Sequence, residues 1–111
     1  MNNNSSILFG RFDEFLWIRC SGRGSFSNSP TVKSLGDEYI ASGGRLIVID
    51  LETCSGIDST FMGTLAGLAR RLMPIDGAVQ IASPSERCLS ALESLGLDAL
   101  LSIEPPTAPW R

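Results

Sequence analysis

Two short stretches rich in β-branched and aromatic residues lie near the start of the chain. Residues 7–12 and 15–20 have this composition, and the acidic pair Asp13 and Glu14 separates them. Two such stretches joined by a short polar connection are typical of a β-hairpin. The sequence therefore predicts an antiparallel hairpin, followed by a loop of Ser, Gly and Asn over residues 21–29.

Apolar residues then recur at helical spacing in two long segments. The first segment begins at Ser29, the expected N-cap, with Pro30 at the first helical position, and it stops at Gly43 and Gly44. The second spans residues 59–73 and is ended by a proline and a glycine. Both segments predict amphipathic helices that cover a sheet.

A third helix is predicted after the stretch Ser83-Pro84-Ser85-Glu86, which has the form of a capping box with proline at the first helical position. Gly96 is its expected end. The residues expected to face the core are Cys88, Leu89, Leu92 and Leu95.

Three further stretches predict strands. Residues 46–51 are almost wholly apolar, as in a strand that is buried on both faces of a parallel sheet. Residues 78–82 and 100–103 predict shorter strands, and residues 52–58 predict a turn. The order β-β-α-β-α-β-α-β predicts an α/β fold with a small mixed, mostly parallel sheet and right-handed crossovers.

The bulk composition narrows the classes of function. A length of 111 residues fits one small domain, which we expect over residues 6–103, with flexible termini at 1–5 and 104–111. The net charge is −3 and the nine Lys and Arg residues are scattered, so we expect neither nucleic-acid binding nor a polybasic membrane patch. The longest apolar run, residues 46–49, is far too short for membrane insertion.

The chain lacks histidine, so it lacks the Ser-His-Asp triad, the Cys-His dyad and the commonest metal ligand. Cys20, Cys54 and Cys88 form no C-x-x-C pair and follow no signal peptide, which predicts free thiols in a reducing cytoplasm and no zinc site. No phosphate-binding glycine motif is present. We therefore expect no cofactor, no metal and no enzymatic activity.

A helical wheel of residues 59–73 separates an apolar arc from an arc of small residues. The core arc is predicted to contain Phe61, Met62, Leu65, Ala66, Leu68, Ala69, Leu72 and Met73. The opposite arc contains Ser59, Thr60, Gly63, Thr64, Gly67, Arg70 and Arg71. Gly63 and Gly67 each cost about 1 kcal/mol of helix propensity relative to alanine. Two explanations stay open: another segment of the domain packs closely there, or the face docks a partner.

Ser59 lies at the start of this helix, where free N–H groups and the helix dipole favour a phosphate. A phosphoserine adds about −1.5 to −2 charges beside a nearly neutral face, which would disrupt docking there. The alternative is that Asp58 or Ser59 only caps the helix. Asp58 could also hold the Ser59 hydroxyl or a kinase-bound Mg²⁺.

Residues 46–65 resemble the signature of STAS domains, a name that covers sulfate transporters and anti-sigma factor antagonists. The shared pattern is an apolar strand, Asp50-Leu51, a short turn, and then Ile57-Asp58-Ser59 before a helix. Residues 18–23 resemble the second strand of the family and its glycine, and the order of elements fits from 6 to 103. The resemblance implies helices packed mainly on one face of a small mixed sheet.

The resemblance also implies a function. Stand-alone members of the family are anti-sigma factor antagonists, which bind an ATP-dependent anti-sigma factor serine kinase when unphosphorylated and so free a sigma factor. The kinase phosphorylates the serine of the Asp-Ser pair, and a metal-dependent PP2C-type phosphatase reverses the reaction. Ser59 is thereby the expected phosphorylation site. The expected partner-binding residues are Asp58, Thr60, Gly63, Thr64 and Gly67.

The sequence departs from the family pattern in two places. Many members have glycine two residues after the serine, where this chain has Phe61. Many also carry an aspartate in the loop near Gly22, whereas residues 22–28 of this chain contain no carboxylate. The first departure bears on access to Ser59, and the second bears on partner contacts from this loop.

Three functions therefore remain to be weighed. The first is a phosphorylation-switched regulator of sigma-dependent transcription that binds a kinase. The second is a STAS subunit of a lipid transporter or of a stress-signalling complex, in which Ser59 is not phosphorylated. The third is a small enzyme built on Asp50, Asp58 and Ser59, which is disfavoured because there is no histidine or second catalytic cluster.

Overall fold

A computed structural model describes residues 5–104, which form one mixed sheet and three α-helices. The strands are β1 (Ser6–Arg11), β2 (Leu16–Gly24), β3 (Leu46–Asp50), β4 (Cys54–Ile57), β5 (Ala78–Ala82) and β6 (Ser102–Glu104). The helices are α1 (Ser29–Ala41), α2 (Ser59–Leu72) and α3 (Glu86–Ser94), with short 3₁₀ helices at Met73–Ile75 and Leu97–Ala99.

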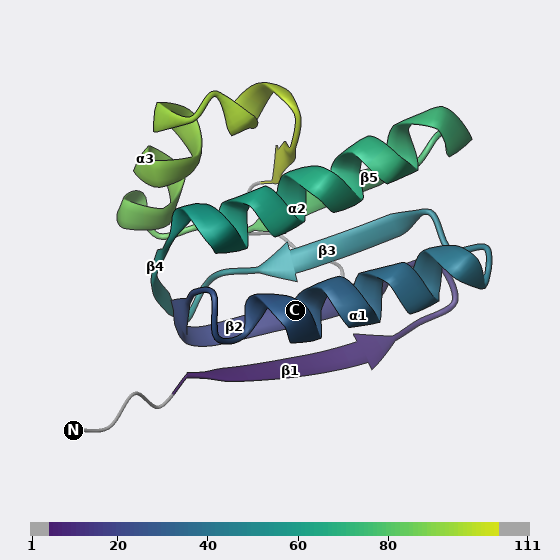
Figure 1. The fold of residues 1–111 in the computed structure, drawn as a ribbon, viewed down its shortest axis with the longest axis horizontal. Coiled ribbons are helices and arrows are strands. Elements are labelled where there is room, and N and C mark those ends of the chain that lie inside the picture. The colour runs from purple at the N-terminus through teal and green to yellow at the C-terminus, as the bar shows by residue number, and fades with distance from the viewer. Residues whose placement is uncertain (1–4, 105–111) are drawn as a thin grey trace.

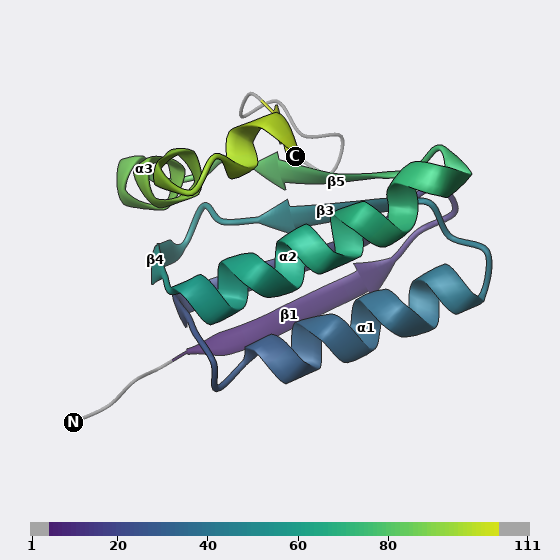
Figure 2. The same ribbon diagram turned by 45° about the horizontal axis from the view of Figure 1, so that its top comes forward.

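The strand order is β1-β2-β3-β5-β6, and β4 pairs with the end of β2 outside this row. β1 and β2 form the predicted antiparallel hairpin, with Gly10 opposite Trp17, and the remaining pairs are parallel. α1 and α2 lie side by side over one face of the sheet (Figures 1 and 2). The predicted α/β fold with a mostly parallel sheet is therefore confirmed.

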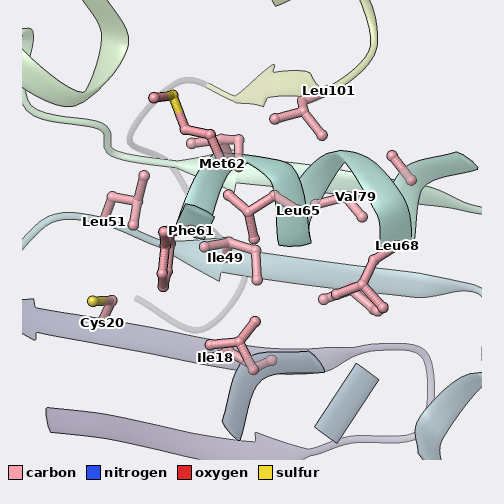
Figure 3. Packing of buried hydrophobic residues seen from close by; sticks show 14 of the residues in the cluster. Ile18, Cys20, Ile49, Leu51, Phe61, Met62, Leu65, Leu68, Val79 and Leu101 are labelled. Atoms are coloured by element: carbon pink, nitrogen blue, oxygen red, sulfur yellow. The ribbon is translucent and has the colours of Figure 1, made fainter. Parts of the chain in front are cut away.

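The core lies between α2 and the sheet. Phe61 and Leu65 are fully buried on the underside of α2, facing Ile18 of β2 and Ile49 of β3 (Figure 3). Full burial of one such side chain contributes about 1.5–3 kcal/mol. Seven of the eight predicted core positions of this helix are buried, but Met73 is 61% exposed because the chain passes there into a 3₁₀ helix.

The prediction of a simple turn over residues 52–58 is wrong, because Cys54–Ile57 forms β4. β4 pairs in parallel with the last residues of β2, which extends to Gly24 instead of ending at Cys20. The paired segments are rich in Gly, Ser and Cys, which have little strand preference of their own. Pairing with a distant segment, rather than local propensity, forms this strand.

The N-caps predicted for the first and third helices differ from the structure by one and two residues. The N-cap of α1 is Asn28, and Ser29 is instead the first helical residue, with its hydroxyl donating to the Ser25 carbonyl at 2.8 Å. α3 begins after Ser85, whose Oγ accepts a hydrogen bond from the Cys88 N–H at 3.2 Å. Ser83, the expected cap, has a φ of 51° and lies outside the helix.

The last helix and the last strand of the domain are shorter than predicted. Leu95 is 54% exposed, because it is the C-cap of α3 and no longer belongs to its inward face. The last strand begins at Ser102 and not at residue 100, since a 3₁₀ helix precedes it.

The termini expected to be flexible fall largely on residues 1–4 and 105–111, which lie outside the described residues. Within residues 5–104, no helix has the length and apolarity needed to cross a membrane.

Candidate functional site

The site forms where the parallel strands end. β2, β3 and β5 run in the same direction, so their carboxyl ends meet at one edge of the sheet, and α2 starts there directly after β4 (Figure 1). Ser59 is the first residue of α2 and its side chain is exposed. In open α/β sheets this edge is the usual place for binding.

Asp58 caps α2. Its Oδ1 accepts a hydrogen bond from the Phe61 N–H at 2.9 Å, and its Oδ2 accepts one from the Phe26 N–H at 3.0 Å. Its own N–H donates to the Gly24 carbonyl at 2.9 Å. Because each carboxylate oxygen already accepts a backbone N–H, the capping interpretation of Asp58 is confirmed, and no hydrogen bond joins its carboxylate to Ser59.

The Ser59 hydroxyl has no hydrogen-bond partner within residues 5–104. Ser59 does not cap the helix, since Asp58 does. The N–H groups of Phe61 and Met62 bond to Asp58, whereas those of Ser59 and Thr60 find no acceptor in the described part of the chain. A free hydroxyl beside two free N–H groups is the arrangement in which a phosphate is favoured.

A groove runs beside Ser59 between α1 and α2. It has a volume of about 320 Å³. Its lining residues are Lys33, Asp37, Thr60, Gly63, Thr64, Gly67, Leu68 and Arg71. Four of the five predicted partner-binding residues thus lie together, and Asp58 stands apart from them at the start of α2. At the far end of the groove, Asp37 accepts from Lys33 at 2.6 Å and also pairs with Arg71.

The two glycines of α2 face open space. A Cβ atom added at Gly63 or at Gly67 would meet no atom within 4 Å. The explanation that these glycines allow close packing inside the domain is therefore wrong. The close approach between α1 and α2 occurs elsewhere, at Gly36, where a Cβ atom would come within 2.6 Å of Leu68 Cδ2.

Phe61, which replaces the glycine common in the family, does not cover Ser59. Its side chain is fully buried and contacts the end of β2, where a Cβ atom on Gly24 would lie 3.0 Å from the Phe61 ring. Figure 3 shows this side chain pointing from α2 toward β2 and Cys20. Access to the Ser59 hydroxyl is therefore unaffected by this departure.

Phe26 is a site residue that the sequence analysis missed. It belongs to the β2–α1 loop, which was predicted only as a polar connection, and 71% of its surface is exposed. The hydrogen bond to Asp58 places its backbone beside the start of α2. An aromatic residue inside a run of Ser, Gly and Asn was the available signal.

Asp50 is not part of this site. Its fully buried carboxylate accepts from Arg19 Nε and Nη2 at 3.1 and 2.8 Å and from the Glu52 N–H at 3.0 Å. These bonds fix the end of β3. Within residues 5–104, no hydrogen bond links Asp50, Asp58 and Ser59 into a common catalytic arrangement.

The three cysteines meet in the core beneath the site. Cys88 Sγ lies 3.7 Å from the Cys54 carbonyl, and Cys54 Sγ donates to the Gly56 carbonyl at 3.3 Å. Hydrogen bonding to the Cys54 thiol lowers the pKa of Cys20 and, together with burial, raises the pKa of Cys88. All three are free thiols, and the described residues contain no group of three His, Cys, Asp or Glu arranged to hold a metal ion.

Known structures share this fold. A putative anti-sigma factor antagonist from Thermotoga maritima, TM1081, has a TM-score of 0.79 and 20% identity, over 87% of this chain and 84% of that one. The Bacillus cell fate determinant SpoIIAA in its phosphorylated form has a TM-score of 0.74 and 20% identity, over 89% and 91%. A sulfate transporter family protein from Wolinella succinogenes has a TM-score of 0.72 and 16% identity, over 87% and 80%.

No curated protein sequence matches the chain. The STAS domain profile, however, matches residues 8–108, which is nearly the whole chain and includes all of α2 and the groove. The protein belongs to the STAS domain family.

Proposed function

We propose that the protein is an anti-sigma factor antagonist, a non-enzymatic cytoplasmic binding module without a cofactor. In its unphosphorylated form it binds an anti-sigma factor serine kinase and so regulates sigma-dependent transcription. The observation that carries the proposal is the exposed, unbonded Ser59 hydroxyl at the first position of α2, beside an open groove. The similarity to TM1081 and to phosphorylated SpoIIAA supports the same class.

The kinase docks along the groove through Thr60, Gly63, Thr64 and Gly67, with Asp58 as the fifth residue of the surface. Nothing in the described chain covers Gly63 or Gly67, so a partner can approach the backbone of α2 closely. Such contact would compensate for the helix propensity that the two glycines lose. Asp58 contributes mainly by holding Phe26 and the helix start in place.

Phosphorylation of Ser59 ends this binding. The phosphate brings about −1.5 to −2 charges to a surface whose nearest groove residues are threonine and glycine. The two free N–H groups of Ser59 and Thr60 stabilise the phosphate on the free protein. Dephosphorylation by a PP2C-type phosphatase restores the docking surface, which completes a two-state switch.

The test is incubation of the purified chain with a purified anti-sigma factor serine kinase of the same organism and ATP, followed by intact mass measurement. We expect one added phosphate, which is absent in Ser59→Ala. The same kinase should bind unphosphorylated chain and should not bind the phosphorylated form. Phosphate on another residue, or none from a kinase that is active on a control substrate, contradicts the proposal.

A second candidate is a STAS subunit of a lipid transporter or of a stress-signalling complex. The similarity to the Wolinella sulfate transporter family protein favours it. In that case Ser59→Ala and Ser59→Glu should bind the partner equally well. Genes for a permease beside the coding gene would support this candidate, and genes for a kinase or phosphatase would support the first.

A further inference from the structure

The loop between β2 and α1 presents an aromatic ring to solvent at the edge of the site. Phe26 is 71% exposed, the largest exposure among the large hydrophobic side chains of residues 5–104 that are exposed. A single exposed apolar residue is ordinary on a protein surface. The surroundings of Phe26 are what distinguish it.

Hydrogen bonds hold this loop in one conformation. The Asn28 side chain accepts from the Ser25 N–H at 2.9 Å and donates to the Arg23 carbonyl at 2.9 Å. The Ser29 hydroxyl, which is buried, donates to the Ser25 carbonyl at 2.8 Å. Phe26 is therefore displayed by a preorganised loop, and docking its ring costs little backbone entropy.

The same loop is tied to the residue next to Ser59. The Phe26 N–H donates to Asp58 Oδ2 at 3.0 Å, and the Asp58 N–H donates to the Gly24 carbonyl at 2.9 Å. Ser59 follows Asp58 in the sequence, and neighbouring Cα atoms are about 3.8 Å apart, so the Ser59 backbone lies beside this contact. A protein whose active site reaches the short side chain of Ser59 therefore comes close to the backbone of Phe26.

We infer that Phe26 is the apolar anchor by which the protein that acts on Ser59 recognises this chain. The ring enters an apolar pocket bordering the catalytic cleft of the serine kinase. This inference rests on the proposed function and adds a specificity-determining residue to it. The core of a protein interface is enriched in aromatic residues and its rim is polar, and Ser27 and Ser59 are exposed on this loop and at the start of α2.

The absence of a carboxylate in residues 22–28 fits this role. A partner that binds this loop meets the Phe26 ring and the exposed cation Arg23, and no carboxylate. The part of the binding free energy that Phe26 contributes should depend weakly on salt, because burial of a phenyl ring is not screened by ions.

The experiment compares Phe26→Ala with Phe9→Ala, a similarly exposed aromatic on β1 (55%), which the proposed site does not include. Binding is measured by titration calorimetry with the anti-sigma factor serine kinase that phosphorylates the wild-type chain. We expect Phe26→Ala to raise Kd at least tenfold, Phe26→Leu to recover most of the affinity, and Phe9→Ala to change Kd less than twofold. In the phosphorylation assay, Phe26→Ala should raise KM with little change in kcat.

Two outcomes overturn the inference while the proposed function stands. In one, Ser59 is phosphorylated and Phe26→Ala binds as tightly as Phe9→Ala. In the other, the Tm of Phe26→Ala falls many degrees below that of Phe9→Ala, which shows that the Phe26 ring supports the fold. If no kinase binds or phosphorylates the chain, the proposed function itself fails, and this role of Phe26 fails with it.

Discussion

Gly36 of α1 lies against Leu68 of α2 so closely that a Cβ atom at position 36 would come within 2.6 Å of Leu68 Cδ2. Gly67 is the sequence neighbour of Leu68, yet a Cβ atom there would meet nothing within 4 Å. The two helices therefore touch through Gly36, and the glycines of α2 serve no packing role inside the domain. This difference separates structural glycines from those available to a partner.

Alanine at these positions should accordingly have opposite effects on stability. Gly67→Ala should raise the free energy of unfolding by about 1 kcal/mol, because it gains helix propensity and meets no atom. Gly36→Ala should lower it by about 1–3 kcal/mol, since Leu68 is only 2% exposed and has little room to move. Equilibrium unfolding in urea measures both. If Gly36→Ala raises the free energy of unfolding, the Leu68 side chain moves aside at little cost.

Asp58 offers a test that separates its two hydrogen bonds. Asp58→Ala removes the cap on the Phe61 N–H and the bond to the Phe26 N–H, so the free energy of unfolding should fall by about 1–2 kcal/mol. Asp58→Asn keeps a good cap, but its amide group has only one acceptor oxygen. It should therefore cost less, and faster amide hydrogen exchange should appear at Phe26 but not at Phe61. If the exchange rates of the Phe26 and Phe61 amides in Asp58→Asn are the same as in wild type, this assignment is contradicted.

Much of the site could be predicted because its determinants are local. The position of Ser59 at a helix start follows from the Asp58-Ser59 pair and the apolar period of α2, which a wheel reproduces apart from Met73. The wheel also predicts that Gly63 and Gly67 lie on the face opposite the core. It does not predict whether another segment covers that face, because this depends on where α1 lies.

The parts that could not be predicted depend on contacts between distant segments. β4 has the composition of a turn, and it becomes a strand only because β2 continues to Gly24 and pairs with it. The bond between Phe26 and Asp58 joins residues 32 positions apart, so no local pattern reveals it. The N-cap of α3 is Ser85 and not the predicted Ser83, because Ser83 takes a left-handed conformation before the helix.

The buried thiols predict a loss of stability at alkaline pH. The Cys54 thiol and burial raise the pKa of Cys88 above its ordinary value of 9.0. Above pH 9 the unfolded chain loses this proton while the folded chain keeps it, so the free energy of unfolding falls as pH rises. One such group contributes at most about 1.4 kcal/mol per pH unit. Cys54, whose pKa is also raised, acts in the same direction, whereas Cys20, whose pKa is lowered, adds stability as pH rises toward 9 and has no further effect above that pH.

Cys88→Ala measures the share of this effect that belongs to Cys88. The substitution will lower stability at every pH, because it removes a fully buried side chain. The informative quantity is the change in unfolding free energy between pH 7.5 and pH 10, which should be smaller in Cys88→Ala than in wild type. An identical change in the two proteins would show that the Cys88 thiol is not held protonated by the fold.

The groove between α1 and α2 gives the sharpest test of the docking surface. Gly63→Arg places a long charged side chain in the space where the partner is proposed to approach, and the Cβ position meets no atom of the chain itself. We expect the fold and Tm to survive, since arginine is a better helix former than glycine. Binding of the serine kinase should fall at least a hundredfold.

Two controls make the result specific. Gly63→Ala adds only a methyl group and should retain most of the binding, and Ser90→Arg adds the same charge on an exposed position of α3 and should bind like wild type. Gly67→Arg should reproduce the loss seen with Gly63→Arg, because both glycines line the same groove. If both arginine variants bind the kinase normally while Ser59 is still phosphorylated, the partner reaches Ser59 without using the groove, and its contacts lie on the side of Phe26 instead.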